Sequence, residues 1–198
     1  MINATFAKEQ YKNGWTTSDT REYLISNQYT DEQTGLTYVY VQQSHQWVPV
    51  FNAISVFLIK NNTVLSFTPG IVKNISKKIK TATPVISAED AIGYALKHLE
   101  RTSQARIKLI SKDNATNRYV FESPEISASP IKVQLVYRVI EEDVFLTWDV
   151  SIEMIKEPHW WNVRVNALNG EYIDKNDFTI QCNFDHPANE LHTYRLEE

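Results

Sequence analysis

Cysteine and glycine are scarce in this 198-residue sequence, which contains one cysteine and five glycines. A single cysteine, Cys182, allows no intramolecular disulfide and no zinc site built from cysteines. So few glycines disfavour folds with many glycine turns and argue against a glycine-rich phosphate-binding loop. No stretch approaches the roughly 18 apolar residues that a membrane-spanning helix needs. Met1–Asn13 also lacks the apolar segment of a signal peptide, so we expect any export signal to have been removed.

An excess of basic residues is also absent, because 24 acidic and 20 basic side chains give a formal net charge of −4. Nucleic-acid-binding proteins usually carry a basic stripe, and the most basic local run here is Lys73–Lys80. Its four lysines are interspersed with apolar residues, which is more typical of a solvated strand or linker than of an anion site. We therefore expect neither nucleic acid nor a membrane as a partner.

Catalytic motifs are missing as well. A zinc peptidase places two histidines and a glutamate in the arrangement H-E-x-x-H, and none of the five histidines has that spacing. They are His45, His98, His159, His186 and His192. No nucleophile elbow is present either. The sequence therefore predicts no catalytic residue, no metal site and no cofactor in this chain, and His98, near a predicted helix end, is expected to be structural.

Enough bulky apolar material for a folded protein is present. Hydrophobic residues make up 42% of the chain, and ten tyrosines and five tryptophans supply large side chains for a core. Hydrophobic periodicity divides the chain into two modules of similar design, each beginning with a helix and continuing as strands. The predicted fold class is α+β, with each module a helix packed on an antiparallel β-sheet.

The first module is predicted to be a short helix followed by a three-stranded antiparallel meander. The helix spans Ser18–Ser26, with Thr17 or Ser18 as its N-cap. Segments rich in β-branched and aromatic residues predict strands at 36–43, 47–59 and 63–67. Pro49 should lie at a strand start, edge or bulge, since it has no amide proton. Asn61-Asn62 should form the last tight turn.

The second module follows a connection over Lys73–Pro84, although Ile71–Ile79 could instead extend as an edge strand. A helix begins with Ser87 as N-cap and Asp90 at the capping-box position, and it should end near Arg101. Alternating patterns then predict strands at 106–110, 118–121, 132–139, 144–152 and 160–167.

Individual side chains in these strands can be assigned to faces. Trp148 should be buried with Asp149 on the opposite face, because successive side chains of a strand alternate. Trp160 and Trp161 alternate in the same way, so one of them should be exposed and could contact a partner. Asn169-Gly170 predicts a hairpin with a type I′ turn.

The segment Tyr38–Gln43, followed after four residues by Val48–Ala53, resembles the fungalysin/thermolysin propeptide motif, commonly called FTP. In typical members a strand ends in Gln-Gln and is followed by a short turn, an apolar-Pro-Val-aromatic step and a second strand. The continuation Asn61–Phe67 resembles the return strand of the family, with Asn62 where glycine is usual. Asparagine also enters left-handed turns, so this departure is compatible with the fold.

The second module resembles the PepSY domain that follows FTP in such propeptides. This resemblance rests on Ile86–Ala91, Leu146–Val150 and Trp160–Glu171, and the stretch after Trp160 points to the fungalysin branch. The resemblance implies cystatin-like and PepSY-like folds. The implied division is an FTP domain at 16–80, a PepSY-like domain at 84–183 and a flexible tail at 184–198.

The resemblance further implies that the chain is the non-catalytic pro-region of a secreted bacterial zinc metallopeptidase. Such a region inhibits the downstream catalytic domain, which is its partner in cis and holds the zinc, and assists its folding. The candidate partner contacts are Gln42, Gln43, Asn52, Trp160, Trp161 and Arg164. The alternative is a stand-alone FTP/PepSY binding or adhesion module without a peptidase partner, and an H-E-x-x-H motif encoded after Glu198 would distinguish the two.

Overall fold

The structure is a computed structural model that describes residues 1–101 and 105–179. The fold is α+β, with few helices and a ten-stranded sheet. Residues 1–80, here called the first half, contain helices α1 (Ile2–Asn13), α2 (Thr17–Thr20) and α3 (Ile75–Lys78) and strands β1 (Tyr23–Asp31), β2 (Leu36–His45), β3 (Val48–Lys60) and β4 (Thr63–Thr68). Residues 81–179, the second half, contain helix α4 (Ala88–His98) and strands β5 (Lys108–Asp113), β6 (Arg118–Glu122), β7 (Ile131–Ile140), β8 (Asp143–Glu153), β9 (Trp160–Asn166) and β10 (Tyr172–Asp177).

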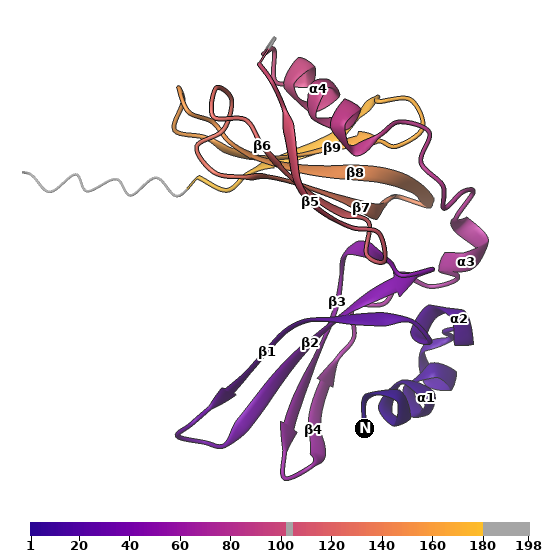
Figure 1. The fold of residues 1–198 in the computed structure, drawn as a ribbon. Coiled ribbons are helices and arrows are strands. Elements are labelled where there is room, and N and C mark those ends of the chain that lie inside the picture. Colours follow the sequence, from indigo (N-terminus) through magenta and orange to yellow (C-terminus); the bar gives the residue numbers. More distant parts are fainter. Residues whose placement is uncertain (102–104, 180–198) are drawn as a thin grey trace, which may run out of the picture.

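The strands form one continuous path in the order β1-β2-β3-β7-β8-β9-β10, with β4 beside β3 and β6 beside β7. Neighbouring strands are antiparallel except β3 and β7, which meet in parallel at Val50 and Tyr137. Figure 1 shows the consequence, because strands β1–β4 and strands β5–β10 diverge from this meeting point as two sheets. The part of the chain that the structure describes contains no helix long and apolar enough to cross a membrane.

Two hydrophobic clusters stabilise the fold. The smaller cluster lies between α1 and the first-half sheet, where Phe6 packs edge-on against Phe57 with ring centroids 5.4 Å apart. The larger cluster lies between α4 and the second-half sheet. Val50 and Ile75, which belong to the first half, are fully buried in the larger cluster. Strand β3 therefore begins in the larger core and reaches the smaller core at Phe57.

The predicted helix at Ser18–Ser26 is wrong beyond its first turn. Helix α2 ends at Thr20, and Tyr23–Asp31 pairs with β2 as a strand, which adds a fourth strand to the predicted meander. Ile71–Ile79 is not an edge strand, because it contains helix α3. Strand β1 is largely exposed and lacks a regular apolar alternation, which is the usual sequence signal.

The other predicted strands of the first half are confirmed. Pro49 lies at the start of β3, where its missing amide proton costs no internal ladder bond. Asn61 and Asn62 form the β3–β4 turn with φ of 49° and 57°, the left-handed conformation that such two-residue turns require. Gly70 follows β4, where a Cβ would lie 2.0 Å from the carbonyl oxygen of Ile54, so only glycine fits.

The second half follows the prediction closely. The Oγ atom of Ser87 accepts a hydrogen bond from the Asp90 amide at 3.0 Å, and the Asp90 carboxylate accepts one from the Ser87 amide at 3.2 Å, which completes the predicted capping box. Trp148 is 2% exposed, and its indole N–H donates to the carbonyl of Ile86 at 3.0 Å. All five predicted strands are present, and Tyr172–Asp177 closes a hairpin with β9.

The turn type of that last hairpin differs from the prediction. Gly170 has a positive φ of 75°, whereas Asn169 does not, so the pair does not form a type I′ turn. The side chains of Asn166 and Asn169 instead accept bonds from the amides of Leu168 and Glu171 within a longer loop. This loop lies against α4, where the ring of His98 is 3.0 Å from the Gly170 carbonyl, as expected for a structural histidine.

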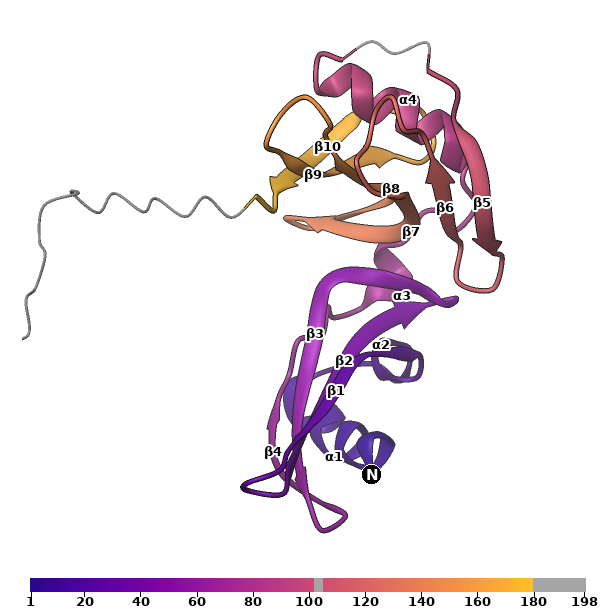
Figure 2. The ribbon, with the colours of Figure 1, turned by 60° about the vertical axis from the view of Figure 1, so that its left-hand side comes forward.

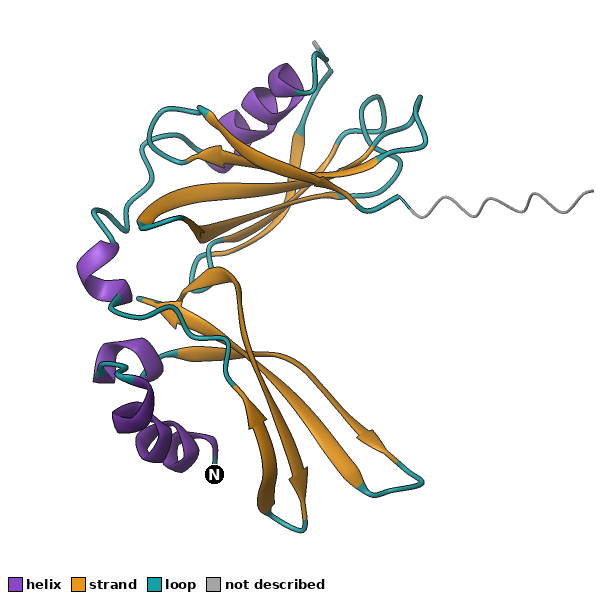
Figure 3. Ribbon diagram, turned by 180° about the vertical axis from the view of Figure 1, so that it is seen from behind, coloured by secondary structure: helices purple, strands orange, loops and turns teal. Residues whose placement is uncertain are grey.

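Each sheet has one face covered by helices and one face without helices, here called its uncovered face. Helices α1 and α2 cover the first-half sheet, and α4 covers the second-half sheet on the side away from the first half (Figure 2). The two sheets are held at an angle by α3 and by the bridge between Ile79 and Val144, and their free ends spread apart on the other side (Figure 3). The uncovered faces are therefore available for the candidate site.

Candidate functional site

The uncovered face of the second-half sheet is polar because alternate residues of its strands point away from α4. One row of these residues is in register across five strands, and we call it the polar ladder. It consists of Arg118 on β6, Gln134 on β7, Asp149 on β8, Arg164 on β9 and Asp174 on β10. Side chains directly opposite each other on neighbouring strands interact most strongly. From β6 to β10 the ladder therefore consists of a cation, an amide, an anion, a cation and an anion, each able to interact with its neighbours.

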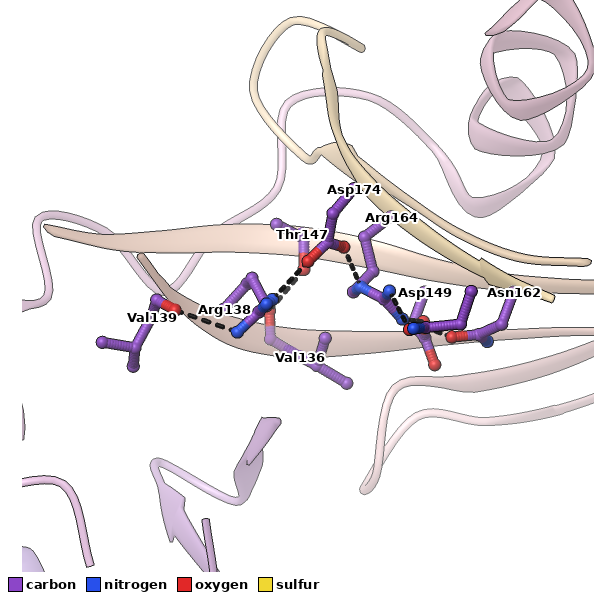
Figure 4. Close-up of polar contacts among 9 residues, drawn as sticks. Val136, Arg138, Val139, Thr147, Asp149, Asn162, Arg164 and Asp174 are labelled. Carbon is purple, nitrogen blue, oxygen red and sulfur yellow. Dashed lines mark hydrogen bonds and ion pairs between the residues drawn. The ribbon is translucent and has the colours of Figure 1, made fainter. Parts of the chain in front are cut away.

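Arg164 is the most buried charge of the ladder, with 1% of its surface exposed. Its guanidinium donates to the carboxylates of Asp174 and Asp149, the latter at 3.2 Å, and to the amide oxygen of Asn162 (Figure 4). It also donates to the amide oxygen of Asn176 at 2.5 Å. A buried charge is tolerated only where it is paired and its remaining protons are hydrogen-bonded. The four acceptors meet that requirement.

The two carboxylates beside Arg164 differ in their surroundings. Asp174 also accepts a hydrogen bond from Arg138 at 2.6 Å, so it joins two guanidinium groups. Burial raises the pKa of Asp149, an effect that its hydrogen bonds from Asn162 and Arg164 oppose without cancelling. The ladder thus holds one carboxylate between two cations and a second carboxylate in a partly desolvated position.

The aromatic ring of Phe51 is the point where the first half contacts the polar ladder. Phe51 lies near the start of β3, and the guanidinium carbons of Arg164 and Arg138 are 4.3 and 5.2 Å from its ring centroid. Such cation–π contacts are worth about 0.5–2 kcal/mol each, more when the pair is shielded from water. The ring shields the guanidinium groups from solvent and joins the two halves through side chains as well as backbone.

The uncovered face of the first-half sheet has a different character. Tyr29, Tyr38 and Tyr40 lie on it, on the side opposite the buried Val39 and Val41. The rings of Tyr29 and Tyr38 are stacked with centroids 4.8 Å apart, and Tyr40 lies 6.3 Å from Tyr29. We call this surface the tyrosine face. Its side chains combine apolar rings with hydroxyl groups, which is typical of protein contact surfaces.

Of the residues predicted as partner contacts, the two adjacent glutamines are used internally. Gln43 is 1% exposed, and its amide nitrogen donates to the carbonyls of Asp19 and Val72 at 2.9 Å each, while its oxygen accepts from the Val72 amide at 2.8 Å. Gln42 is half-buried and donates to the carbonyl of Val50 at 3.0 Å. The Gln-Gln pair therefore ties β2 to α2, to the segment before α3 and to β3.

The other four predicted contacts lie nearer to the polar ladder. Asn52 is exposed in a left-handed conformation with φ of 60°, next to Phe51. Trp160 is 43% exposed and donates to the Ser151 hydroxyl at 2.8 Å, whereas Trp161 is half-buried beside His159. One exposed and one less exposed tryptophan is the alternation that the sequence predicts. As partner contacts all six residues stay a prediction, and Gln43 and Arg164 have no exposed surface with which to act directly.

Asp19 is a key residue that sequence reasoning missed. It is fully buried, and its carboxylate accepts three backbone N–H bonds, from Thr16 at 2.7 Å, Asn74 at 3.0 Å and Ile75 at 2.9 Å. The local signal was the capping-box spacing of Thr16 and Asp19. The long-range bonds to the start of α3 have no sequence signal.

Over residues 1–101 and 105–179 the structure has no group of three or more histidine, cysteine, aspartate or glutamate side chains that could hold a metal ion. Cys182, His186 and His192, together with the predicted tail at 184–198, lie outside the described residues. The contacts that the ladder residues make are ion pairs and hydrogen bonds.

Known proteins resemble this chain over limited regions. Residues 21–68 match the family model described as Fungalysin/Thermolysin Propeptide Motif, which confirms the FTP resemblance for that segment. Comparison with curated proteins gives no match. Among solved structures, the Bacillus megaterium YpeB C-terminal domain aligns with a TM-score of 0.38 and 11% identity, over 89% of this chain and 65% of that chain. That likeness is too weak to support an argument, so the PepSY resemblance of the second half and the fungalysin branch stay predictions.

Proposed function

We propose, from the fungalysin/thermolysin propeptide motif in residues 21–68, that this chain is the non-catalytic pro-region of a secreted zinc metallopeptidase. The motif is the single observation that carries the proposal, because propeptide motifs of this family belong to protease precursors and are not themselves catalytic. In this proposal the chain inhibits the catalytic domain and assists its folding. The zinc and the catalytic residues belong to that domain.

We propose that both predicted domains, FTP at 16–80 and PepSY-like at 84–183, contact the peptidase. In each, a helix-covered sheet presents its other face to the peptidase. The tyrosine face, which lies within the matched motif, supplies apolar contact area. Covalent linkage in cis raises the effective concentration of the pro-region to the order of millimolar, so a modest intrinsic affinity is sufficient for inhibition.

The predicted contact residues divide into two roles under this proposal. Asn52 and Trp160 are exposed and would touch the peptidase directly. Gln42, Gln43 and Arg164 would position the surfaces, because their polar atoms are bonded within the chain. Trp161 is half-buried and would contribute only its edge.

Inhibition in trans tests the proposal. The purified chain, added in micromolar excess to the mature cognate peptidase, should slow cleavage of a peptide substrate and should raise the yield of active enzyme on refolding. Trp160→Ala should weaken inhibition severalfold, while Trp47→Ala, which removes a comparably exposed tryptophan on the β2–β3 turn, should not. Full peptidase activity in the presence of excess chain would rule the proposal out.

The reading frame after Glu198 separates this proposal from the stand-alone binding or adhesion module. An H-E-x-x-H motif within a few hundred residues is expected for a pro-region. A stop codon directly after this segment would favour the stand-alone module. No observation on the described residues favours that alternative over the pro-region.

A further inference from the structure

The two ends of the polar ladder differ in how well their polar groups are satisfied. At one end Arg164 and Asp174 are fully paired, but at the other end neither Arg118 nor Gln134 has such a partner. The amide nitrogen of Gln134 is buried and has no hydrogen-bond acceptor among the described residues. Arg118 has no ion pair in the same part of the chain, although Asp113 lies across from it on β5. A buried donor without an acceptor destabilises the chain, so an acceptor supplied from outside would be stabilising.

Asp113 is not a substitute for that acceptor. Its carboxylate accepts hydrogen bonds from the Ala115 amide at 2.9 Å and from the Thr116 hydroxyl at 2.6 Å, both in the β5–β6 turn. These bonds, with a smaller contribution from the charge of Arg118, lower the pKa of Asp113, and they hold its oxygens within its own turn. The donors of Arg118 therefore remain available to a ligand.

A cavity of about 310 Å³ lies at this free end of the ladder. Most of the residues that line it form two neighbouring cross-strand rows on β6, β7 and β8. One row is Arg118, Gln134 and Asp149, and the other is Val120, Lys132 and Ser151. Ser151 accepts a bond from the Trp160 indole at 2.8 Å, which leaves its own hydroxyl proton free to donate. Four side chains that carry hydrogen-bond donors therefore line one pocket, with a valine on its wall.

The charges around the cavity favour a monovalent anion. Arg118 and Lys132 contribute two positive charges, and no ion pair engages either of them in the described ranges. Asp149 contributes a negative charge that Arg164 partly neutralises. Glu122 is exposed on β6, where Lys108 lies opposite it. Because Arg164 offsets much of the Asp149 charge, the lining has an excess of one to two positive charges, which a single carboxylate can balance through charge-assisted hydrogen bonds.

We propose that this cavity binds the carboxylate of an aspartate or glutamate side chain presented by an extended peptide. The carboxylate oxygens would accept hydrogen bonds from the amide of Gln134 and from Arg118, with Lys132 at the rim, and the side-chain methylene groups would contact Val120. The cavity is larger than a carboxylate alone requires, which favours a side chain together with part of its backbone. The inference is independent of the proposed pro-region function, because it concerns the isolated chain.

The test is an NMR titration of the full chain with blocked tripeptides. Ac-Ala-Glu-Ala-NH2 should shift the side-chain amide resonance of Gln134 saturably, whereas Ac-Ala-Gln-Ala-NH2 and sodium acetate should shift it only weakly. Arg118→Ala and Lys132→Ala should each weaken binding of the glutamate peptide about tenfold, as expected for loss of a charge-assisted contact. Lys8→Ala, which removes an exposed lysine on α1, should leave the affinity unchanged.

Three results would overturn the proposal. Equal binding of the glutamine peptide would show that the carboxylate is not recognised. Unchanged affinity in the Arg118→Ala variant would place binding elsewhere. Acetate binding as tight as that of the glutamate peptide would make the cavity a site for free anions and not for a side chain. Gln134→Met fills the same volume without a donor, so it should weaken binding while the chain stays folded.

Discussion

The two halves of the molecule bury charge in different ways. In the first half the Asp19 carboxylate is satisfied by three backbone amides, two of them at the start of α3. In the second half the Arg164 guanidinium is satisfied entirely by side chains on its own and neighbouring strands. The positions of backbone amides are fixed once the path of the chain is set. Side-chain partners on neighbouring strands meet only if those strands pair in the correct register. The buried charge of the first half therefore depends on the path of the backbone, and that of the second half depends on strand alignment.

The largest effect is expected for Arg164→Ala. It leaves the carboxylates of Asp149 and Asp174 partly buried without this guanidinium, and breaking a buried pair in this way costs about 3–5 kcal/mol. Urea unfolding should show the loss. Arg164→Lys keeps the charge but not the planar fork of donors, so it should recover only part of the stability. A loss below about 1 kcal/mol for Arg164→Ala would contradict the role given to side-chain pairing.

Asp19→Ala should have the next largest effect, about 3 kcal/mol, because three buried or part-buried N–H groups lose their acceptor. The effect should be local, so amide hydrogen exchange should accelerate at Asn74 and Ile75 but not in α4. Asp90→Ala removes the capping-box carboxylate of α4 and should cost about 1 kcal/mol. In this variant, amide exchange should accelerate in α4 but not at Asn74 and Ile75. Equal acceleration in both halves for Asp19→Ala would show that the halves do not respond separately.

Phe51→Ala tests the contact between the halves and should cost about 2 kcal/mol, from lost burial and lost cation–π contacts. Phe51→Leu keeps most of the apolar volume and should cost less. Small-angle X-ray scattering should show a larger radius of gyration for Phe51→Ala if the ring holds the two sheets together. An unchanged radius would mean that the β3–β7 pairing and α3 are sufficient.

The smallest effects are expected from pH, and they should have opposite signs at two aspartates. Burial raises the pKa of Asp149, so its contribution to stability is fully present below the unfolded pKa of about 3.9 and is lost as the pH rises through the folded value. A hydrogen bond from Thr179 helps to lower the pKa of Asp177 to about 2, so its contribution is present above about 3.9 and is lost as the pH falls through about 2. NMR titration of the carboxyl carbons should show these displacements, and an unshifted Asp149 would contradict the partly desolvated position.

Almost all helices and strands of the second half could be predicted from the sequence. Ser87 and Asp90 marked the start of α4, and alternation marked each following strand, because these elements have one buried and one exposed face. The first half was harder. Helix α1 buries only Phe6 among its residues, and β1 is an exposed edge strand stabilised by its pairing with β2. Neither has an amphipathic pattern that sequence can reveal.

The site was predictable in composition but not in arrangement. The sequence drew attention to Arg164 and to the Gln42-Gln43 pair, yet the roles of Arg164 and Gln43 as buried, multiply bonded side chains depend on contacts between distant segments. The polar ladder itself could not be predicted from the sequence, because its five members come from five strands and are aligned only by the register of strand pairing. Phe51 could be recognised as an aromatic step of the motif but not as the cover of two arginines.

The parallel pairing of Val50 with Tyr137 has a consequence for synthesis on the ribosome. Strand β3 is made long before β7, so its first residues, including Phe51, have no partner while the rest of the first half can already fold. Arg164 is made later still, and its partner Asp174 belongs to the last described strand. A nascent chain interrupted before Asp174 would carry an incompletely paired guanidinium under Phe51. Completion of β10 therefore supplies the last acceptors of the Arg164 guanidinium at the junction between the halves.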